Sequence, residues 1–141
     1  MAEPVVEPVV NAEATAMVHK TMPYTATLGI EVLRSEAAET RSRLAWAANL
    51  CTAAGAMHGG ALMSVADANG GLCAFLNLPE GSSGTTTIES KTNFIRGIRD
   101  GHVTAVSRPL HAGKRIIVVE TDLLDDAGKL VGRVTQTQAV L

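Results

Sequence analysis

The run from Met57 to Leu78, MHGGALMSVADANGGLCAFLNL, is the longest apolar stretch of the chain and constrains its fold most strongly. Apolar residues recur in it at spacings of three and four, which predicts a helix with an apolar stripe. The stripe consists of Leu62, Val65, Ala66, Leu72, Cys73 and Leu76. Its other sides carry small residues instead of Lys or Glu, so we expect the helix to be buried. Pro79 ends it, because proline disfavours a helical conformation in the residue before it.

Three features of this run are costly in an ordinary buried helix. It begins with His58-Gly59-Gly60, which leaves backbone N–H groups free at the positive end of the helix dipole. It places Asp67 where a buried helix prefers alanine, because an unpaired buried carboxylate is unfavourable. It also contains Gly70-Gly71, and a glycine inside a helix costs about 1 kcal/mol relative to alanine. Each feature alone has a structural explanation, but together they indicate a functional site.

The spacing of His58 and Asp67 predicts how such a site is built. Nine residues separate them, so at roughly 100° per residue their side chains lie half a turn out of phase, about 13 Å apart along the axis. They therefore cannot serve one reaction centre within a single chain. Asp67 shares its side of the helix with mostly small residues: Gly60, Met63, Gly71 and Ala74. This pattern predicts an isologous homodimer with two composite sites, because small residues let a second backbone approach.

The segments around the run predict a single α+β domain. Residues 1–22 contain a flexible tail, 1–10, and a short helix, 11–22, which Asn11 caps and Pro23 ends. Residues 27–47 alternate as a hairpin of two strands. The chain after the central helix predicts four strands in a meander, at 85–98, 102–110, 115–125 and 129–141. We expect residues 23–141 to form a curved antiparallel sheet wrapped around one long helix.

Composition excludes several classes of function. A net charge of −2 and an aromatic content of 3% disfavour nucleic-acid binding. Cys51 and Cys73 lack CxxC spacing, so we expect reduced thiols, no metal site and a cytoplasmic protein. The first residues lack the pattern of a signal peptide. The polar residues His58, Asp67 and Asn69 inside the central run favour a soluble helix over a membrane span.

The motifs HGGALMSVAD (58–67), TNFIRG (92–97), PLHAGKR (109–115) and the later D-x-x-G-K-L-V hairpin resemble those of a known family. With the order of elements, they resemble the hotdog-fold acyl-CoA thioesterases, in particular the phenylacetate-pathway and hydroxybenzoyl-CoA branch. The resemblance covers about residues 24 to 141. It implies a hotdog fold and hydrolysis of an aryl or medium-chain acyl-CoA to a free acid and coenzyme A, without a further cofactor. It also implies a homotetramer built as a dimer of dimers.

The resemblance implies roles for five catalytic residues. Asp67 is the general base or nucleophile. The backbone N–H of Gly59, with His58 beside it, binds the thioester oxygen at the helix start, as an oxyanion hole requires. Thr52 stands where the family usually has Asn or Gln. Thr87 matches a hydroxyl on the strand after the helix.

The resemblance also implies where coenzyme A binds. The segment Phe94, Ile95, Arg96 and Gly97 matches the lining of the pantetheine path, and the phosphates are matched by His111, Gly113, Lys114 and Arg115. We expect Leu62, Met63 and Phe75 of one or both chains to line the acyl pocket. Two alternatives are a hotdog-fold enoyl-thioester hydratase or dehydratase, and a non-catalytic acyl-CoA-binding module. The usual motifs of the former are missing from the sequence, and the carboxylate of Asp67 disfavours the latter.

Overall fold

A computed structural model of the protein describes residues 6–141, so the first half of the predicted flexible tail lies outside the described residues. Its helices are α1 (Ala12–Thr21), α2 (Pro23–Leu28) and α3 (Gly59–Leu76), with a short 3-10 turn at Ala48–Leu50. Its strands are β1 (Glu31–Glu36), β2 (Glu39–Ala45), β3 (Thr85–Phe94), β4 (His102–Ala112), β5 (Ile116–Leu124) and β6 (Leu130–Val140). The central helix predicted in the run from Met57 to Leu78 is therefore confirmed as α3.

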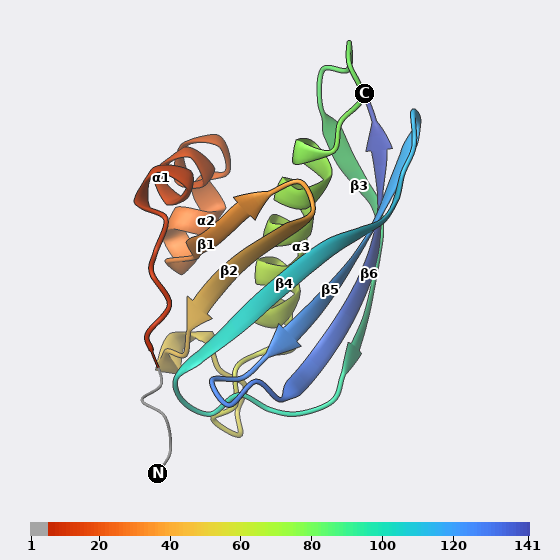
Figure 1. Ribbon diagram of the computed structural model, residues 1–141. Helices are drawn as coiled ribbons and strands as arrows, with labels where there is room; N and C mark the ends of the chain where they lie inside the picture. The colour runs from red at the N-terminus through yellow and green to blue at the C-terminus, as the bar shows by residue number, and fades with distance from the viewer. Residues whose placement is uncertain (1–5) are drawn as a thin grey trace.

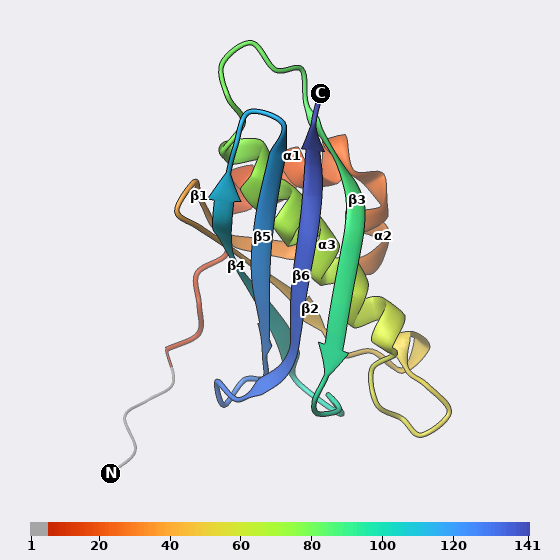
Figure 2. The same cartoon turned by 90° about the vertical axis from the view of Figure 1, so that its right-hand side faces the viewer.

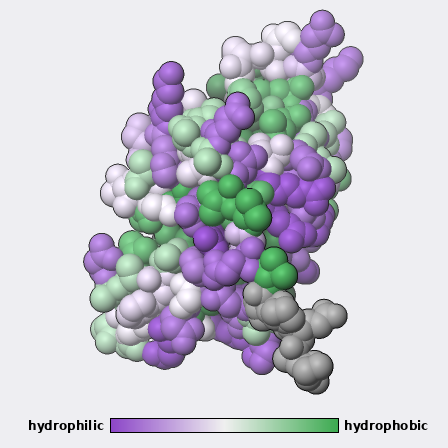
Figure 3. All heavy atoms as spheres, turned by 60° about the vertical axis from the view of Figure 1, so that its left-hand side comes forward, coloured by the Kyte–Doolittle hydropathy of each residue, from purple (hydrophilic) through white to green (hydrophobic). Residues whose placement is uncertain are grey.

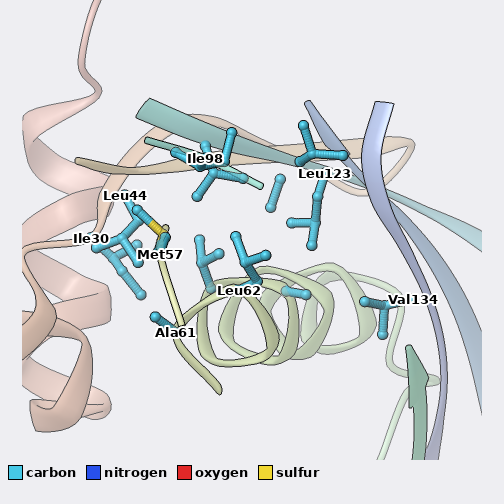
Figure 4. Packing of buried hydrophobic residues seen from close by; sticks show 13 residues of the cluster. Ile30, Leu44, Met57, Ala61, Leu62, Ile98, Leu123 and Val134 are labelled. Carbon is cyan, nitrogen blue, oxygen red and sulfur yellow. The ribbon is translucent and has the colours of Figure 1, made fainter. Parts of the chain in front are cut away.

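Within the described residues, six antiparallel strands form one sheet in the order β1-β2-β4-β5-β6-β3. The sheet curves around α3, as Figures 1 and 2 show, and confirms the predicted α+β architecture. The apolar stripe of α3 faces the sheet. In the core, Ala61 and Leu62 point from the helix toward residues such as Leu44, Ile98 and Leu123 (Figure 4).

The predicted meander of four strands is wrong for β3. This strand pairs with β6 at one edge of the sheet, whereas β4 pairs with β2 near the other side. The segment 95–101 is therefore a crossover and not the turn of a hairpin. Ile98 is buried within it, and its carbonyl accepts a hydrogen bond from the N–H of Met57 at 2.7 Å. The crossover thus passes beneath the start of α3 and closes that end of the core.

A buried amide joins α3 to the sheet. The Oδ1 atom of Asn69 accepts a hydrogen bond from Ser42 Oγ at 2.8 Å, and its Nδ2 atom donates to Ser107 Oγ at 2.7 Å. Nδ2 also lies within hydrogen-bond distance of the carbonyl oxygens of Thr40 and Ala105. Asp67 precedes Asn69 by two residues, or about 200° around the helix. Asp67 therefore faces away from the sheet's centre.

The expectation that α3 is buried on all sides is wrong for one side. Met63 and Phe75 are 38% and 55% exposed in the single chain, and Asp67 is exposed as well. The apolar stripe and Asn69 attach the helix to the sheet along one side only. The sheet therefore curves around the helix without enclosing it. The uncovered side lies between α1 and α2 on one flank and β3 on the other (Figure 2).

Helix α1 covers the free edge of β1. The N–H of Asn11 donates to the carbonyl of Val32 at 2.8 Å, and the N–H of Val32 donates to Thr15 Oγ1 at 2.9 Å. The ring Nε2 of His19 donates to the carbonyl of Ile30 at 2.7 Å. These bonds satisfy backbone groups that an edge strand otherwise exposes. β3, at the opposite edge, is mostly exposed.

The helix predicted at 11–22 is confirmed, including its cap, because Asn11 Oδ1 accepts a hydrogen bond from the N–H of Ala14 at 2.9 Å. Pro23 follows its end, as expected, but also begins α2, which the sequence analysis missed. Proline suits the first position of a helix, where its missing N–H costs nothing. Seen from the side of α1 and α2, hydrophilic side chains surround separate apolar patches (Figure 3).

One carboxylate joins three arginines on the face of the sheet turned away from α3. The Glu39 side chain is only 9% exposed and lies 3.2 Å from Arg34 Nη1 and 2.6 Å from Arg108 Nη2. It also accepts a hydrogen bond from Arg41 Nε. The hydrogen bond from Arg41, together with the charges of Arg41 and Arg108, holds the pKa of Glu39 below its ordinary value of 4.5. The carboxylate thus stabilises the pairing of β1, β2 and β4.

We predict that Glu39→Gln lowers the free energy of unfolding at pH 7 by about 1–2 kcal/mol, because charged hydrogen bonds are lost. A carboxyl group with a lowered pKa stabilises the fold above its unfolded-state pKa, and this contribution disappears as the pH falls through the folded-state pKa. The free energies of unfolding of the two proteins, measured with denaturant, should therefore approach each other as the pH falls below about 4.5.

The matched control is Glu36→Gln. Its side chain is 59% exposed and pairs with Arg34 among the described residues. An exposed pair contributes little, so we expect a change below about 1 kcal/mol at pH 7. Equal losses for the two variants would show that Glu39 is no more important than a surface ion pair.

Candidate active site

The start of α3 presents hydrogen-bond donors to solvent. The Nδ1 atom of His58 accepts the N–H of Gly60 at 2.8 Å and so caps the helix. The neutral ring consequently carries its proton on Nε2, which is free to donate. No hydrogen bond to a described residue engages the N–H of Gly59. The helix start therefore offers two donors, Gly59 N–H and His58 Nε2–H, to an approaching oxygen.

A cavity of about 370 Å³ lies beside these donors. It is lined by Met57, Gly59, Leu62 and the predicted pantetheine segment Phe94, Ile95, Arg96 and Gly97. The ring of Phe94 packs on the helix start so closely that a Cβ atom at Gly59 would lie 2.9 Å from its Cζ. A side chain at position 59 would therefore require the exposed ring of Phe94 to move. The structure brings the predicted pantetheine segment and the predicted oxyanion donor together.

Asp67 is held by hydrogen bonds from the far edge of the sheet. Its Oδ1 atom accepts a hydrogen bond from Thr87 Oγ1 at 2.9 Å and another from Gln136 Nε2 at 3.2 Å. Thr87 in turn accepts one from Gln138 Nε2 at 2.6 Å. The structure thus brings together Asp67 and Thr87, two of the predicted site residues.

Gln136 and Gln138 are functional candidates that the sequence analysis missed. Both side chains are buried, at 0% and 1% exposure. Because side chains of a strand alternate between faces, Gln136 and Gln138 lie on the same face as the buried Val134. The signal available in the sequence was the alternation itself, which places the amides of Gln136 and Gln138 on the same face as Val134. Gly70 of α3 faces Gln136, and a Cβ atom there would lie 2.6 Å from its Cδ.

Two further cavities meet at Asp67. The larger, about 400 Å³, has an apolar wall from α1 and α3 and a polar wall from β3 and β6. Its apolar lining includes Met17, Val18, Met22, Leu72 and Phe75, and its polar lining includes Thr85, Thr86, Thr87 and Gln138. The smaller, about 310 Å³, is lined by Met63, Ser64, Asp67, Thr87 and Ser90. Asp67 therefore lies between two hollows, one of them largely apolar.

The expected acyl-pocket residues divide between these hollows. Phe75 and Met63 line the two cavities at Asp67, as expected. Leu62 lines neither of them: it is buried in the core and lines the cavity at the helix start. The contribution of Met17 in α1, and of Met22 just after it, was not anticipated, because it depends on how α1 docks against β1.

Gly59 and Asp67 line different cavities in the single chain, as their helical phase predicts. Thr52 joins neither of them. Its hydroxyl accepts a hydrogen bond from the N–H of Ala54 at 3.3 Å, within the exposed loop before α3. No hydrogen bond among the described residues links Thr52 to the helix start or to Asp67.

The predicted phosphate-binding residues form the turn between β4 and β5. Gly113 is tightly placed, because a Cβ atom there would lie 2.9 Å from the carbonyl oxygen of Ile116. The side chains of His111, Lys114 and Arg115 are exposed. Within the described residues, no carboxylate forms an ion pair with Lys114 or Arg115. Two unpaired cations beside a glycine turn are suited to bind phosphate.

This turn and the pantetheine segment lie at opposite ends of the sheet. Phe94 pairs with Gly132 of β6, whereas Ile116, next to the turn, pairs with Ala139. Seven residues of β6 span about 23 Å, so one chain does not bring the two predicted coenzyme A segments together.

Other sites are not supported by the described part of the chain. It contains no group of three or more His, Cys, Asp or Glu side chains placed to hold a metal. None of its helices is long and apolar enough to cross a membrane. Burial raises the pKa of the Cys73 thiol to about 11, so this thiol is a poor nucleophile. A hollow of about 680 Å³ on the outer face contains Arg34, Arg41 and Arg43, but these arginines are already in ion pairs.

Comparison with known proteins gives a consistent assignment. A family model described as "Thioesterase superfamily" matches residues 54–132. The 1,4-dihydroxy-2-naphthoyl-CoA hydrolase of Escherichia coli (strain K12) is 33% identical over 87 residues, which cover 62% of this chain and 63% of that protein. The chain spans about half to two thirds of the length of the first curated relatives it matches.

Two solved structures from Pseudomonas aeruginosa share the fold. The conserved protein PA5202 superposes with a TM-score of 0.74 at 37% identity, covering 84% of this chain and 93% of that one. A mutant of the thioesterase PA1618 gives a TM-score of 0.83 at 25% identity, covering 90% of this chain and 93% of that one.

The two neighbouring glycines of α3 should respond differently to alanine. Gly71 borders the apolar cavity, and a Cβ atom there meets nothing within 4 Å among the described residues. We predict that Gly71→Ala raises the free energy of unfolding by up to about 1 kcal/mol through helix propensity. In Gly70→Ala the new methyl group overlaps the buried amide of Gln136, so the free energy of unfolding should fall by about 1–3 kcal/mol.

Denaturant unfolding at equal protein concentration measures both changes. Each variant is the control for the other, because the substitution and the helix are the same. Stabilisation by Gly70→Ala would show that the Gln136 amide does not press against the helix.

Proposed function

The chain belongs to the thioesterase superfamily, and from this premise we propose that it hydrolyses an acyl-CoA thioester to a free carboxylic acid and coenzyme A. The observation that carries the proposal is the position of Asp67. Its carboxylate is held by Thr87 and Gln136 between two cavities, on the helix whose start offers the free N–H of Gly59. A carboxylate and an oxyanion site are the two groups that hydrolysis of a thioester requires.

The helix start stabilises charge on the thioester oxygen. In the proposed mechanism this oxygen accepts hydrogen bonds from Gly59 N–H and His58 Nε2–H. Negative charge develops on it as the carbonyl carbon becomes tetrahedral, and the positive end of the α3 dipole favours that charge. Because His58 Nδ1 is occupied by Gly60 N–H, the ring is oriented before the substrate binds.

Asp67 supplies the second function. As a general base it takes a proton from water while the water oxygen attacks the carbonyl carbon. As a nucleophile it attacks that carbon itself, and water then hydrolyses the resulting anhydride. In either route the carbon–sulfur bond breaks, the coenzyme A thiolate leaves, and a proton from water restores the thiol. The carboxylate of Asp67 is regenerated.

The cavity of about 400 Å³ beside Asp67 supports an aryl or medium-chain acyl group. Its wall of methionine, leucine and phenylalanine side chains is apolar, while the threonines of β3 and Gln138 provide hydrogen-bonding groups. Small-molecule sites combine these features, with a few polar groups that fix orientation. The relative from Escherichia coli is named for an aryl-CoA substrate, 1,4-dihydroxy-2-naphthoyl-CoA.

We further propose that the active unit is a homodimer joined along β3. The other sheet edge is covered by α1, whereas β3 is exposed and carries Ile88 at 60% exposure. Antiparallel pairing of two β3 strands places the Phe94 end of one beside the Thr85 end of the other. The proposal thereby places Gly59 of one chain near Asp67 of its partner. Assembly of two such dimers into a tetramer stays a prediction.

The same pairing supports a coenzyme A site made by two chains. Thr85 pairs with Val140, whose N–H donates to the carbonyl of Arg115 at 2.9 Å. The turn containing Lys114 and Arg115 therefore lies at the Thr85 end of β3. In the proposed dimer this turn faces the pantetheine segment of the partner, which begins at Phe94.

We predict that Asp67→Asn keeps the fold but lowers kcat at least about a hundredfold, because the base or nucleophile is lost. Release of free thiol from a panel of aryl and alkyl acyl-CoAs measures the rate and also identifies the acyl group. Asp100→Asn, an exposed acid on the crossover after β3, is the matched control and should be fully active. No thiol release from any member, or a fully active Asp67→Asn protein, would contradict the proposal.

We also predict that two inactive variants complement each other. A Gly59→Pro chain lacks the oxyanion N–H and an Asp67→Asn chain lacks the carboxylate, so each homodimer should be nearly inactive. Their heterodimer has one site with both intact groups and one with neither. Its activity should be about half that of wild type, by the symmetry of an isologous interface.

Dimer formation by each variant is the control for this experiment, because proline at position 59 also meets the ring of Phe94. Heterodimers that form normally but stay inactive would place each site within one chain.

A further inference from the structure

Gln136 and Gln138 carry buried amides at positions where an apolar side chain would pack without the cost of burying polar atoms. With Thr85 and Thr87 they form a network, here called the Thr–Gln network, that ends at Oδ1 of Asp67. We propose that Gln136 and Gln138 are positioning residues that fix the orientation of the Asp67 carboxylate for catalysis. This inference rests on the proposed function of Asp67.

The bonds around Gln138 run in one direction. Its Oε1 atom accepts a hydrogen bond from Thr85 Oγ1 at 3.1 Å, and its Nε2 atom donates to Thr87 Oγ1 at 2.6 Å. A hydroxyl has one proton, and Thr87 Oγ1 already accepts from the amide. Its proton is therefore directed to Asp67 Oδ1, 2.9 Å away. Gln138 thus makes Thr87 a donor to the carboxylate.

Gln136 provides a second donor to Asp67 and reduces the stability of the fold in doing so. Its Nε2 atom lies 3.2 Å from Asp67 Oδ1. Its Oε1 atom is buried against Gly70 and has no hydrogen-bond partner among the described residues. A glycine inside a helix and an unpaired buried oxygen both reduce stability. Both features accommodate the side chain of Gln136, the amide that donates to Asp67.

The network leaves the two oxygens of Asp67 inequivalent. Oδ1 accepts both hydrogen bonds, and no described residue donates to Oδ2. An exposed aspartate otherwise rotates freely about its terminal torsion, which is broad and roughly two-fold. The network fixes the plane of the carboxylate, and Oδ2 stays without a donor among the described residues on a side chain that lines both cavities. Oriented reacting groups react faster because less rotational freedom is lost at the transition state.

Kinetics of Gln136→Met and Gln138→Met test the proposal, because methionine keeps the size of glutamine without its hydrogen bonds. Each should lower kcat by about tenfold to a hundredfold and leave KM within about twofold, since orientation and not binding is lost. Thr137→Val, on the opposite face of β6 between the two amides, is the matched control and should leave kcat unchanged. An unchanged kcat in both methionine variants overturns the proposal.

A double-mutant cycle separates positioning from general damage to β6. If Gln138 acts through Thr87, the double variant Thr87→Val/Gln138→Met is no slower than Thr87→Val alone. Thr87→Ser keeps the hydroxyl, so in that background Gln138→Met should again lower kcat. Additive losses in the valine background would overturn the role of Gln138.

A measurement without substrate distinguishes failure of this inference from failure of the proposed function. Unfolding of Gln136→Met, Asp67→Ala and the double variant gives the coupling between the two side chains. Coupling in a protein that releases no thiol would refute the proposed function and leave the carboxylate's orientation supported. Absence of coupling would overturn the inference whatever the activity.

Discussion

The hydrogen bonds of Asn69 determine which side of α3 faces the sheet. Its amide is surrounded by partners on β2 and β4, including the buried hydroxyls of Ser42 and Ser107. Rotation of α3, or a shift by one residue, would leave the buried amide unpaired at a cost of about 1–3 kcal/mol. With Asn69 facing inward, Asp67 must face the edge of the sheet. The position of the candidate catalytic carboxylate thus follows from a residue that does not touch the site.

Much of the fold was predictable because periodicity and caps are local. The apolar stripe identified α3, and Asn11 identified the start of α1. The position of β3 was not predictable from the sequence. The turn signal at Arg99–Gly101 is the same whether the next strand pairs with β3 or crosses to another part of the sheet. That choice depends on long-range contacts, such as the burial of Ile98 beneath the helix start.

The candidate site divides in the same way. The opposition of Gly59 and Asp67 followed from the helical repeat alone, and Thr87 from the family resemblance. The Thr–Gln network did not, because glutamines in a strand are usually exposed and only the pairing of β3 with β6 places them beside Asp67. The contribution of α1 to the apolar cavity was also hidden, since it depends on Thr15 and His19 meeting the edge of β1.

The docking of α1 has a consequence for how selectivity can vary. This helix supplies Met17 and Val18 to the wall of the apolar cavity, yet it belongs to neither the sheet nor α3. Under the proposed function, part of the wall that contacts the acyl group therefore comes from an element that carries none of the catalytic residues. Substitution of α1 side chains would then change which acyl groups are accepted without changing the catalytic residues. Any ligand that touches α1 must also favour its docked state, because binding stabilises the conformation it contacts.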